Sequence, residues 1–283
     1  MTDARALLRD AEARLAAGGV ASPQHDAEVL LAFVADVSRT AISITDITPA
    51  QATTYEALVE RRAAREPLQH LTGSAHFRYV ELAVGPGVFV PRPETELLAG
   101  WVIEAAARIA AEGRAPVVVD LCTGSGAIAK SIAHEVPSAI VHAVELSDDA
   151  LAWAERNLAH TTVRLTPGDV ATALPDLDKT VDLVVCNPPY IPLEAWESVA
   201  PEARDHDPHL ALFSGADGLD AMRALEATAA RLLVPGGLVG AEHADAQGES
   251  APGVFAATGR WTDVRDHSDF NERPRFLTAR LAR

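Results

Sequence analysis

The chain has 283 residues, of which 48% are hydrophobic and 23% charged, so it can build a packed core and wholesale disorder is excluded. Its 24 basic and 40 acidic side chains give a net charge of −16, which argues against a broad basic face for nucleic acid or anionic membrane. Two cysteines exclude a disulfide scaffold, and we expect a cytoplasmic protein because no secretory signal and no apolar run of the ~20 residues that span a bilayer are visible.

The first 75 residues are predicted to form a small bundle of amphipathic helices. Apolar residues share one helical stripe within residues 4–19, and Gly18-Gly19 ends that helix. A second helix follows Ser22-Pro23 and a third follows Thr48-Pro49, because proline suits the first helical turn. We take residues 1–75 as a helical, substrate-binding domain.

Residues 76–90 differ in character and are predicted to form a β-hairpin linker. Residues of high β-propensity flank Gly85-Pro86-Gly87, which indicates a strand pair with its turn at these three residues. A helix is expected after Pro93, within residues 94–113.

From residue 117 onward, short apolar runs alternate with helical segments. Strands are predicted at 117–121, 140–145, 163–167, 181–186, 238–243, 261–267 and 275–282, and helices at 126–136, 147–160 and 219–233. This alternation is typical of an α/β fold with a doubly wound, mostly parallel sheet, here of seven strands. No helix is evident between the last two strands, so we expect them to pair antiparallel. The second domain is placed at residues 91–283.

The first of these strands leads into a glycine-rich turn. Asp120 is followed by Cys122, Thr123, Gly124, Ser125 and Gly126, where glycines let the backbone approach a ligand. The turn lacks the Lys-Ser/Thr pair of a Walker phosphate loop and the full glycine fingerprint of dinucleotide-binding folds.

Acidic residues lie at the ends of three successive strands. They are Asp120, Glu145 and Asp169, and the carboxyl ends of parallel strands meet at one crevice where ligands bind. An acid at the end of the second strand suits ribose hydroxyls. Each acid alone would equally well cap a helix or a turn, but three beside a glycine turn favour ligand binding.

The fourth strand ends in Asn187-Pro188-Pro189-Tyr190. The two prolines fix the backbone and cannot continue the strand. The oxygen of the Asn187 side chain and the Pro188 carbonyl could together accept both hydrogens of a planar NH₂ group, which Tyr190 could cover. The alternative is a proline-rich turn with a capping asparagine.

In this order, these motifs resemble those of class I S-adenosylmethionine-dependent methyltransferases that alkylate planar amino groups. The segments PLQHLTGSAHF (67–77), VFVPRPETELL (88–98), PEARDHDPHLALFSGADGLD (201–220) and NERPRF (271–276) narrow the resemblance. Together they are similar to the protein-glutamine N5-methyltransferases of peptide chain release factors, over nearly the whole chain.

The resemblance implies transfer of a methyl group from S-adenosylmethionine, with S-adenosylhomocysteine as product, to the side-chain amide of the Gln in the Gly-Gly-Gln motif of bacterial class I release factors. It implies catalysis by the segment Asn187, Pro188, Pro189 and Tyr190. It implies cofactor binding by Asp120, Cys122, Thr123, Gly124, Ser125, Gly126, Glu145, Asp169, Val170 and Asn187. A monomer without direct contact to nucleic acid or membrane is expected.

Two positions depart from the pattern of this family. Cys122 stands where a glycine is usual, and we expect its side chain either to narrow the approach of the cofactor or to require a negative φ. Asp207-Pro208 replaces a usual Glu-Pro pair.

Cys122 and Cys186 end neighbouring strands. We favour a role as small buried side chains that fill space in the core over a redox pair. No metal site is expected, because the spacing of His206 and His209 lacks partner ligands, and no nucleophile is expected at Ser125.

Three other functions fit parts of the sequence. An adenine N6-methyltransferase of DNA or RNA explains the Asn-Pro-Pro-Tyr segment equally well, but not the acidic balance. A non-catalytic binding module of the same fold and a nicotinamide-dependent oxidoreductase are the remaining alternatives.

The negative charge is concentrated in the second part of the chain. Residues 1–75 hold 10 acidic and 7 basic side chains, and residues 76–283 hold 30 and 17. If a protein is the substrate, we expect it to present a basic surface.

Overall fold

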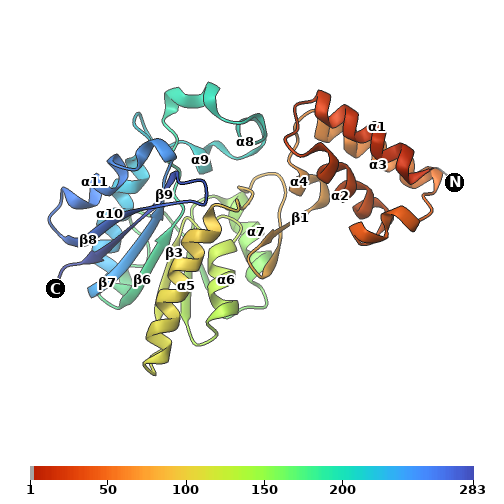
Figure 1. The fold of residues 1–283 in the computed structure, drawn as a ribbon. Helices are drawn as coiled ribbons and strands as arrows, with labels where there is room; N and C mark the ends of the chain where they lie inside the picture. Colours follow the sequence, from red (N-terminus) through yellow and green to blue (C-terminus); the bar gives the residue numbers. More distant parts are fainter. Residues whose placement is uncertain (1–2) are drawn as a thin grey trace. The chain divides into compact units, whose positions relative to one another are not determined.

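The structure, a computed structural model, describes residues 3–283, which form two compact units. The helical unit ends at Ser74 and also includes Ala200–His206. The sheet unit consists of Ala75–Val199 and Asp207–Arg283. Figure 1 shows the course of the chain through both units. No helix within residues 3–283 is both long and apolar enough to cross a membrane.

Within the described residues, the helical unit has the three predicted helices and three short ones. The predicted helices are α1 (Ala4–Ala17), α2 (Pro23–Ala35) and α3 (Pro49–Ala63), and the short ones are the 3₁₀ helix η1 (Arg39–Ile44), α4 (Leu68–Thr72) and α8 (Pro201–His206). A reciprocal capping box of Thr48 and Gln51 begins α3, with Pro49 in its first turn. Leu15, Leu30 and Tyr55 are fully buried in the core between the helices.

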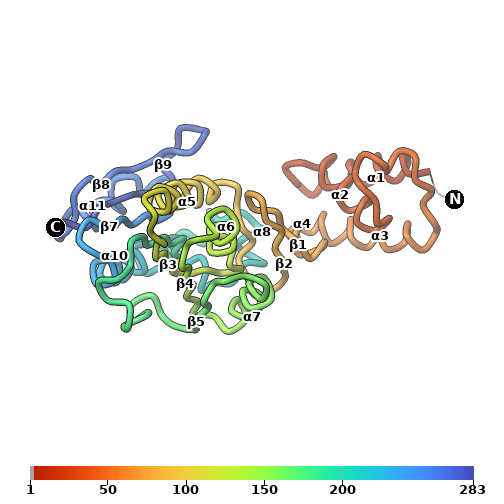
Figure 2. Tube along the Cα trace, turned by 90° about the horizontal axis from the view of Figure 1, so that it is seen from below, coloured from red at the N-terminus to blue at the C-terminus, as the bar shows by residue number. Residues whose placement is uncertain are grey.

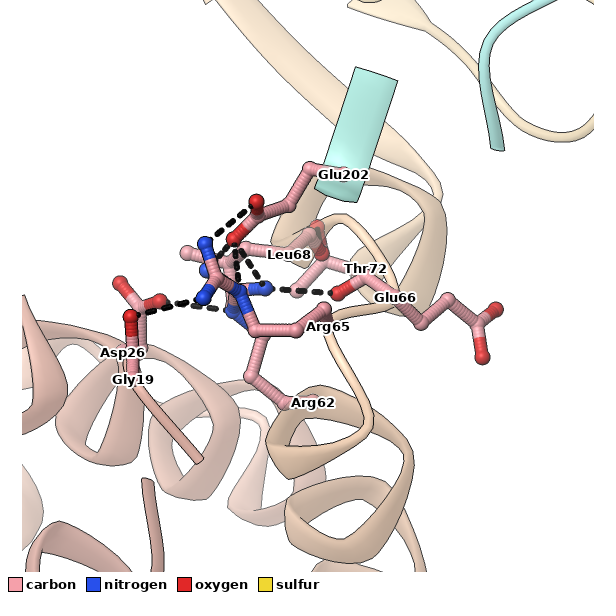
Figure 3. Close-up of polar contacts among 8 residues, drawn as sticks. All are labelled: Gly19, Asp26, Arg62, Arg65, Glu66, Leu68, Thr72 and Glu202. Atoms are coloured by element: carbon pink, nitrogen blue, oxygen red, sulfur yellow. Dashed lines mark hydrogen bonds and ion pairs between the residues drawn. The ribbon is translucent and has the colours of Figure 1, made fainter. Parts of the chain in front are cut away.

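A charged cluster is enclosed in the helical unit (Figure 3). Arg62 Nε donates to Asp26 Oδ2 at 2.8 Å, and both side chains are only 8% exposed. Arg62 and Arg65 also donate to the carboxylate of Glu202 in α8, with Arg65 Nη2 at 2.6 Å from Oε2. These contacts tie α8 to α3, although 140 residues separate Arg62 from Glu202.

The hairpin lies earlier than the sequence predicts. Its strands are β1 (Ser74–Phe77) and β2 (Val80–Ala83), with the turn at Arg78-Tyr79 rather than at residues 85–87. Arg78 has φ +50, and its guanidinium donates to Glu135 at 2.6 and 2.7 Å while its backbone N–H donates to Glu96. These distant partners hold a conformation that a non-glycine residue rarely adopts.

Residues 85–87 form a turn without a second strand. A Cβ atom on Gly85 would lie 2.7 Å from the ring of Trp153, and Trp153 Nε1 donates to the Pro86 carbonyl at 3.2 Å. Only glycine therefore permits the close approach of this turn to the tryptophan.

The sheet unit contains a seven-stranded sheet in the order β5-β4-β3-β6-β7-β9-β8. The strands are β3 (Val117–Leu121), β4 (Ile140–Glu145), β5 (Arg164–Pro167), β6 (Val181–Cys186), β7 (Leu233–Glu242), β8 (Trp261–Ser268) and β9 (Pro274–Leu281). The first five are parallel, and β9 pairs antiparallel with both β7 and β8. The predicted α/β class and the antiparallel final pair are confirmed. β7 begins five residues earlier than predicted.

Helices cover both faces of this sheet (Figures 1 and 2). The helices α5 (Thr95–Ala111), α6 (Ala127–Glu135) and α7 (Asp148–Leu158) share one apolar core with the hairpin. The helices α10 (Asp220–Leu232) and α11 (Ser250–Ala256) pack in the other core. The remaining elements are α9 (His209–Leu212) and the 3₁₀ helices η2 (Pro175–Leu177), η3 (Leu193–Ser198) and η4 (Asp245–Gln247). Sandwiched strands are buried on both faces, which is why they read as continuous apolar runs.

The buried cluster generates a prediction on stability. Arg62→Met leaves the Asp26 carboxylate buried without its cationic partner, so the free energy of unfolding should fall by about 3–5 kcal/mol. The neighbouring Arg61 pairs with Glu66 while its side chain is 53% exposed, so Arg61→Met should cost less than about 1 kcal/mol. Urea unfolding followed by circular dichroism, with hydrogen exchange to localise the loss to α2 and α3, measures both. Equal losses of stability in the two variants would contradict the stabilising role of the buried Arg62–Asp26 pair.

Candidate active site

The predicted site residues gather at the carboxyl ends of the parallel strands of the sheet unit. A cavity of about 520 Å³ opens there, a volume within the usual range for small-molecule sites. Of the predicted residues, its walls include Cys122, Thr123, Gly124, Ser125, Glu145, Asp169, Val170, Asn187, Pro189 and Tyr190. Asp120, Gly126 and Pro188 are not among the lining residues.

The glycine turn connects β3 to α6 and forms one wall of the cavity. Gly124 has φ +58, and a Cβ atom placed on it would meet no atom within 4 Å. This backbone conformation favours glycine, and the space beside Gly124 stays open. Gly126, at φ +84, precedes the first residue of α6 and lies against Leu158 of α7.

Cys122 adopts the glycine-like backbone despite its side chain. Its φ is +58, so the expectation of a negative φ at this position is wrong. A left-handed non-glycine residue costs roughly 1–2 kcal/mol. Cys186 is fully buried and pairs with Leu121, the residue before Cys122, and burial, followed by the neighbouring Cys122, raises the pKa of its thiol. The predicted proximity of the two thiols, on the neighbouring strands β3 and β6, is confirmed.

Asp120 lies within β3, beneath the turn rather than on the cavity wall. Its Oδ2 accepts hydrogen bonds from Thr123 Oγ1 at 2.6 Å and from the Ala129 N–H at 3.1 Å. Within residues 3–283, the buried Oδ1 has no hydrogen-bond partner. Burial, opposed by these two bonds, raises the pKa of Asp120 to about 7. The carboxyl group thus holds the turn and the first turn of α6 together.

Glu145 ends β4 and lines the cavity. Its Oε2 accepts from the Gly124 N–H at 2.8 Å, and its Oε1 accepts from the N–H groups of Leu146 and Ser147 at 2.9 and 2.8 Å. A carboxylate offers about four acceptor positions, so three backbone donors leave one for a ligand. Glu145 therefore fixes the glycine turn and still faces the cavity.

Asp169 and Val170 follow β5 and complete the row of strand ends. Asp169 Oδ1 accepts from the Ala171 N–H at 2.8 Å, which leaves its other oxygen available to a ligand. Both residues line the cavity together with Leu146, which is 52% exposed. This wall combines an exposed carboxylate with apolar surface.

The Asn-Pro-Pro-Tyr segment leaves the sheet at the end of β6. Asn187 Nδ2 donates to Thr95 Oγ1 at 3.3 Å, and Tyr190 Oη donates to Glu242 Oε1 at 3.3 Å. Burial, followed by the nearby Glu242, raises the pKa of the Tyr190 phenol well above its ordinary value, so the hydroxyl stays a donor.

The backbone of this segment is fixed from the other side. Gln247 Nε2 donates to the Tyr190 carbonyl at 3.0 Å, and the Ile191 N–H donates to the Leu212 carbonyl at 2.8 Å. A Cβ atom on Gly218, at φ +77, would lie 2.3 Å from the Tyr190 carbonyl oxygen. Only glycine therefore allows this contact.

Thr95, Glu242 and Gln247 are site residues that the sequence reasoning missed. Thr95 lies in the PRPETE segment (residues 91–96) and is the first residue of α5. Glu242 ends β7, so it repeats the pattern of an acid at a strand end that identified Glu145, and that signal could have found it. Nothing in the sequence pattern marks Gln247.

Two further motif residues meet beside the cavity. Arg92 of the PRPETE segment donates to the buried Asp207 at 2.7 Å. The Arg92 guanidinium also lies 5.1 Å from the ring centre of Phe89, which lines the cavity.

His209 packs against Trp196 with ring centres 4.7 Å apart. In the described residues, no group of three His, Cys, Asp or Glu side chains is arranged to hold a metal ion.

Comparison with known proteins follows the division into two units. Residues 6–73 match the model of the PrmC N-terminal domain, and residues 118–206 match a methyltransferase domain model. The catalytic domain of hMettl16, solved with the MAT2A 3′UTR hairpin 6, superposes with a TM-score of 0.56 at 12% identity over 82% of each chain. This likeness shows a methyltransferase fold.

Similarity to curated proteins covers the whole chain. A release factor glutamine methyltransferase of Streptomyces coelicolor is 58% identical over 97% of both chains. Another from Mycolicibacterium smegmatis is 46% identical over 100% of both. With these identities, the chain belongs to the release factor glutamine methyltransferase family.

Proposed function

We propose that the chain transfers the methyl group of S-adenosylmethionine to the side-chain amide nitrogen of the Gln in the Gly-Gly-Gln motif of class I release factors. The observation that carries this proposal is the position of Asn187 and Tyr190 on the cavity wall, in a chain with full-length likeness to release factor glutamine methyltransferases. The group that such a wall suits best as the recipient of the methyl group is a planar NH₂ group.

The chemical difficulty is the low reactivity of an amide nitrogen. Its lone pair is delocalised into the carbonyl, the same resonance that flattens a peptide bond. Asn187 Oδ1 and the Pro188 carbonyl would each accept one N–H of the substrate amide. Two acceptors favour the positive charge that develops on nitrogen and direct its lone pair toward the methyl group. No side chain need remove the proton first, and water can take it after transfer.

The cavity fits S-adenosylmethionine, which supplies an electrophilic sulfonium methyl group when bound. Gly124 opens onto free space, and Glu145 retains an acceptor position for a ribose hydroxyl. Asp169 and Val170, with the exposed Leu146, offer a polar and an apolar surface on the same wall. Asp120 would act indirectly, by holding Thr123 and α6 in place. Correct alignment of the two reactants can supply roughly 7–11 kcal/mol of the barrier reduction.

An adenine N6-methyltransferase would use the same pair of acceptors on an exocyclic amino group. The net charge of −16 opposes approach to a phosphate backbone, and the curated relatives carry the release factor name. The charge and these names support a protein substrate. The proposal also includes action in the cytoplasm and as a monomer.

The acceptor role of Asn187 yields the first prediction of activity. Asn187→Ala should lower methyl transfer to a release factor about 10²-fold or more, because one of the two groups that orient the amide is lost. Binding of the release factor should stay within about threefold. The matched control is Asn271→Ala, since Asn271 is exposed on the loop between β8 and β9. Mass analysis of the release factor measures both variants. More than half of wild-type activity in Asn187→Ala would refute the role.

The cofactor role of Glu145 is tested by binding alone. Glu145→Ala removes the acceptor of three backbone N–H groups, so the affinity for S-adenosylmethionine should fall about tenfold to a hundredfold. The control Asp148→Ala changes an exposed acid in the next helix and should leave affinity unchanged. Calorimetric titration reads both variants, and wild-type affinity in Glu145→Ala would remove this residue from the site.

The charge of the chain predicts how binding responds to salt. Residues 76–283 hold 30 acidic and 17 basic side chains, so a release factor with a basic surface would be steered toward them. The association rate should fall by about tenfold as salt rises from about 0.05 M to about 0.5 M, because screening shortens the range of the field. Stopped-flow binding measures it, and a rate that does not change with salt would contradict electrostatic steering.

A further inference from the structure

The turn between β8 and β9 holds a large apolar side chain out in solvent. Phe270 is 92% exposed, the highest value for any large hydrophobic side chain in the described part of the chain. Figure 2 shows this turn projecting beyond the rest of the sheet unit. Single exposed apolar residues are common on protein surfaces, so exposure alone indicates no function. The construction of the turn and its position carry the argument further.

The turn is held by a buried carboxylate rather than left to move. Asp269 has a side chain that is only 5% exposed, and its Oδ1 accepts from the N–H groups of Asn271 and Arg273 at 2.8 and 3.1 Å. Arg275 Nη2 donates to its Oδ2 at 3.1 Å. The Asp269 N–H also donates to the Arg273 carbonyl at 2.8 Å. The backbone on both sides of Phe270 is therefore fixed before any partner binds.

This turn follows the edge of the sheet at which the cavity opens. Glu242, the last residue of β7, lies opposite Phe276 of β9, and Phe276 lies opposite His267 of β8. Phe270 follows His267 by three residues, so the two lie at most about 11 Å apart. Glu242 also accepts the hydrogen bond from Tyr190 of the cavity wall. The turn thus lies beside the opening without forming part of the cavity wall.

A protein can place one side chain in the cavity only if the surface around that side chain rests on this edge. A stable protein–protein contact covers roughly 800 Å² of each partner, which is a patch of about 16 Å radius. Leu210 lines the cavity and is 53% exposed, so apolar surface is already present at the opening. A patch of that size centred on the cavity extends over the ends of β7 and β9, where the turn begins.

We propose that Phe270 is a docking residue for the release factor, whose apolar surface packs on the phenyl ring while its Gln side chain occupies the cavity. A fixed aromatic side chain suits this role, because the backbone is already ordered and only two side-chain torsions are lost on binding. Phenylalanine is also among the residues enriched in protein interfaces. The ring acts on binding of the protein substrate and takes no part in methyl transfer. This inference rests on the proposed function.

The variant that tests the contact is Phe270→Ala. We expect Kd and KM for the intact release factor to rise about tenfold, because the apolar contact at the turn is lost. Values of kcat and of the affinity for S-adenosylmethionine should stay within about twofold. Phe270→Leu keeps an apolar side chain and should stay within about threefold of the wild-type Kd. The urea midpoint of both variants should equal that of the wild type, since the ring is in solvent.

The matched control is Tyr79→Ala, which removes another exposed aromatic side chain from a hairpin turn of the same unit. Tyr79 is 75% exposed between β1 and β2. The neighbouring Arg78 is bonded to Glu135 at the last residue of α6, whereas Ala127 at the first residue of α6 lines the cavity. Tyr79→Ala should leave Kd unchanged. Wild-type Kd in Phe270→Ala, or an equal loss in both variants, would overturn the proposal.

A second readout reports direct contact. In Phe270→Trp, the fluorescence of the introduced indole should move to shorter wavelength when the release factor is added, while Tyr79→Trp should show no such shift. A missing shift in Phe270→Trp would contradict docking at this turn. A wild-type dimer that Phe270→Ala dissociates, measured by sedimentation, would also overturn the proposal by assigning the turn to a second copy.

These binding measurements do not depend on turnover, so they separate this inference from the proposed function. A wild-type chain that binds the release factor through Phe270 but does not methylate it would refute only the proposed function. A chain that methylates the release factor with the same KM in wild type and Phe270→Ala would refute only the docking role.

Discussion

The chemistry proposed at the end of β6 depends on the hydrogen bonds that hold the two polar side chains of the Asn-Pro-Pro-Tyr segment. Tyr190 Oη donates to Glu242, which is buried at the end of β7, the strand beside β6 in the sheet, and Asn187 Nδ2 donates to Thr95 Oγ1. These two contacts set the orientation of the side chains at the two ends of the segment. A site that must accept two N–H groups needs its own donors turned away, and Glu242 and Thr95 receive them.

Hydrogen bonds also join motifs that lie far apart in the sequence. The PRPETE segment supplies Thr95 to Asn187, and it supplies Arg92 to Asp207 in the segment that follows α8. That following segment also receives the backbone of Ile191, just after Tyr190. These contacts therefore let one segment support the position of another, and the loss of any of them is expected to affect the cavity.

The sequence predicts the sheet well because its strands are buried on both faces and separated by helices. The strands at 117–121, 140–145 and 181–186 have the predicted bounds. The hairpin turn was misplaced because Arg78 is held at φ +50 by Glu135 and Glu96, partners that lie 57 and 18 residues away. Asp120 was predicted on the cavity wall but lies beneath it, since a strand residue turns its side chain by alternation. Glu242 carried the signal of an acid at a strand end, whereas the direction of the hydrogen bonds around it depends on tertiary packing.

In the proposed reaction the cavity orients a glutamine side-chain amide for methyl transfer. The most direct measurement is fragment-mass mapping of a class I release factor after incubation with the chain and S-adenosylmethionine, beside an equal amount of duplex DNA. We expect one added methyl group, on the side-chain nitrogen of the Gln in the Gly-Gly-Gln motif, and none on the DNA. Methylation of another release-factor residue, or of adenine in place of the glutamine, would contradict it.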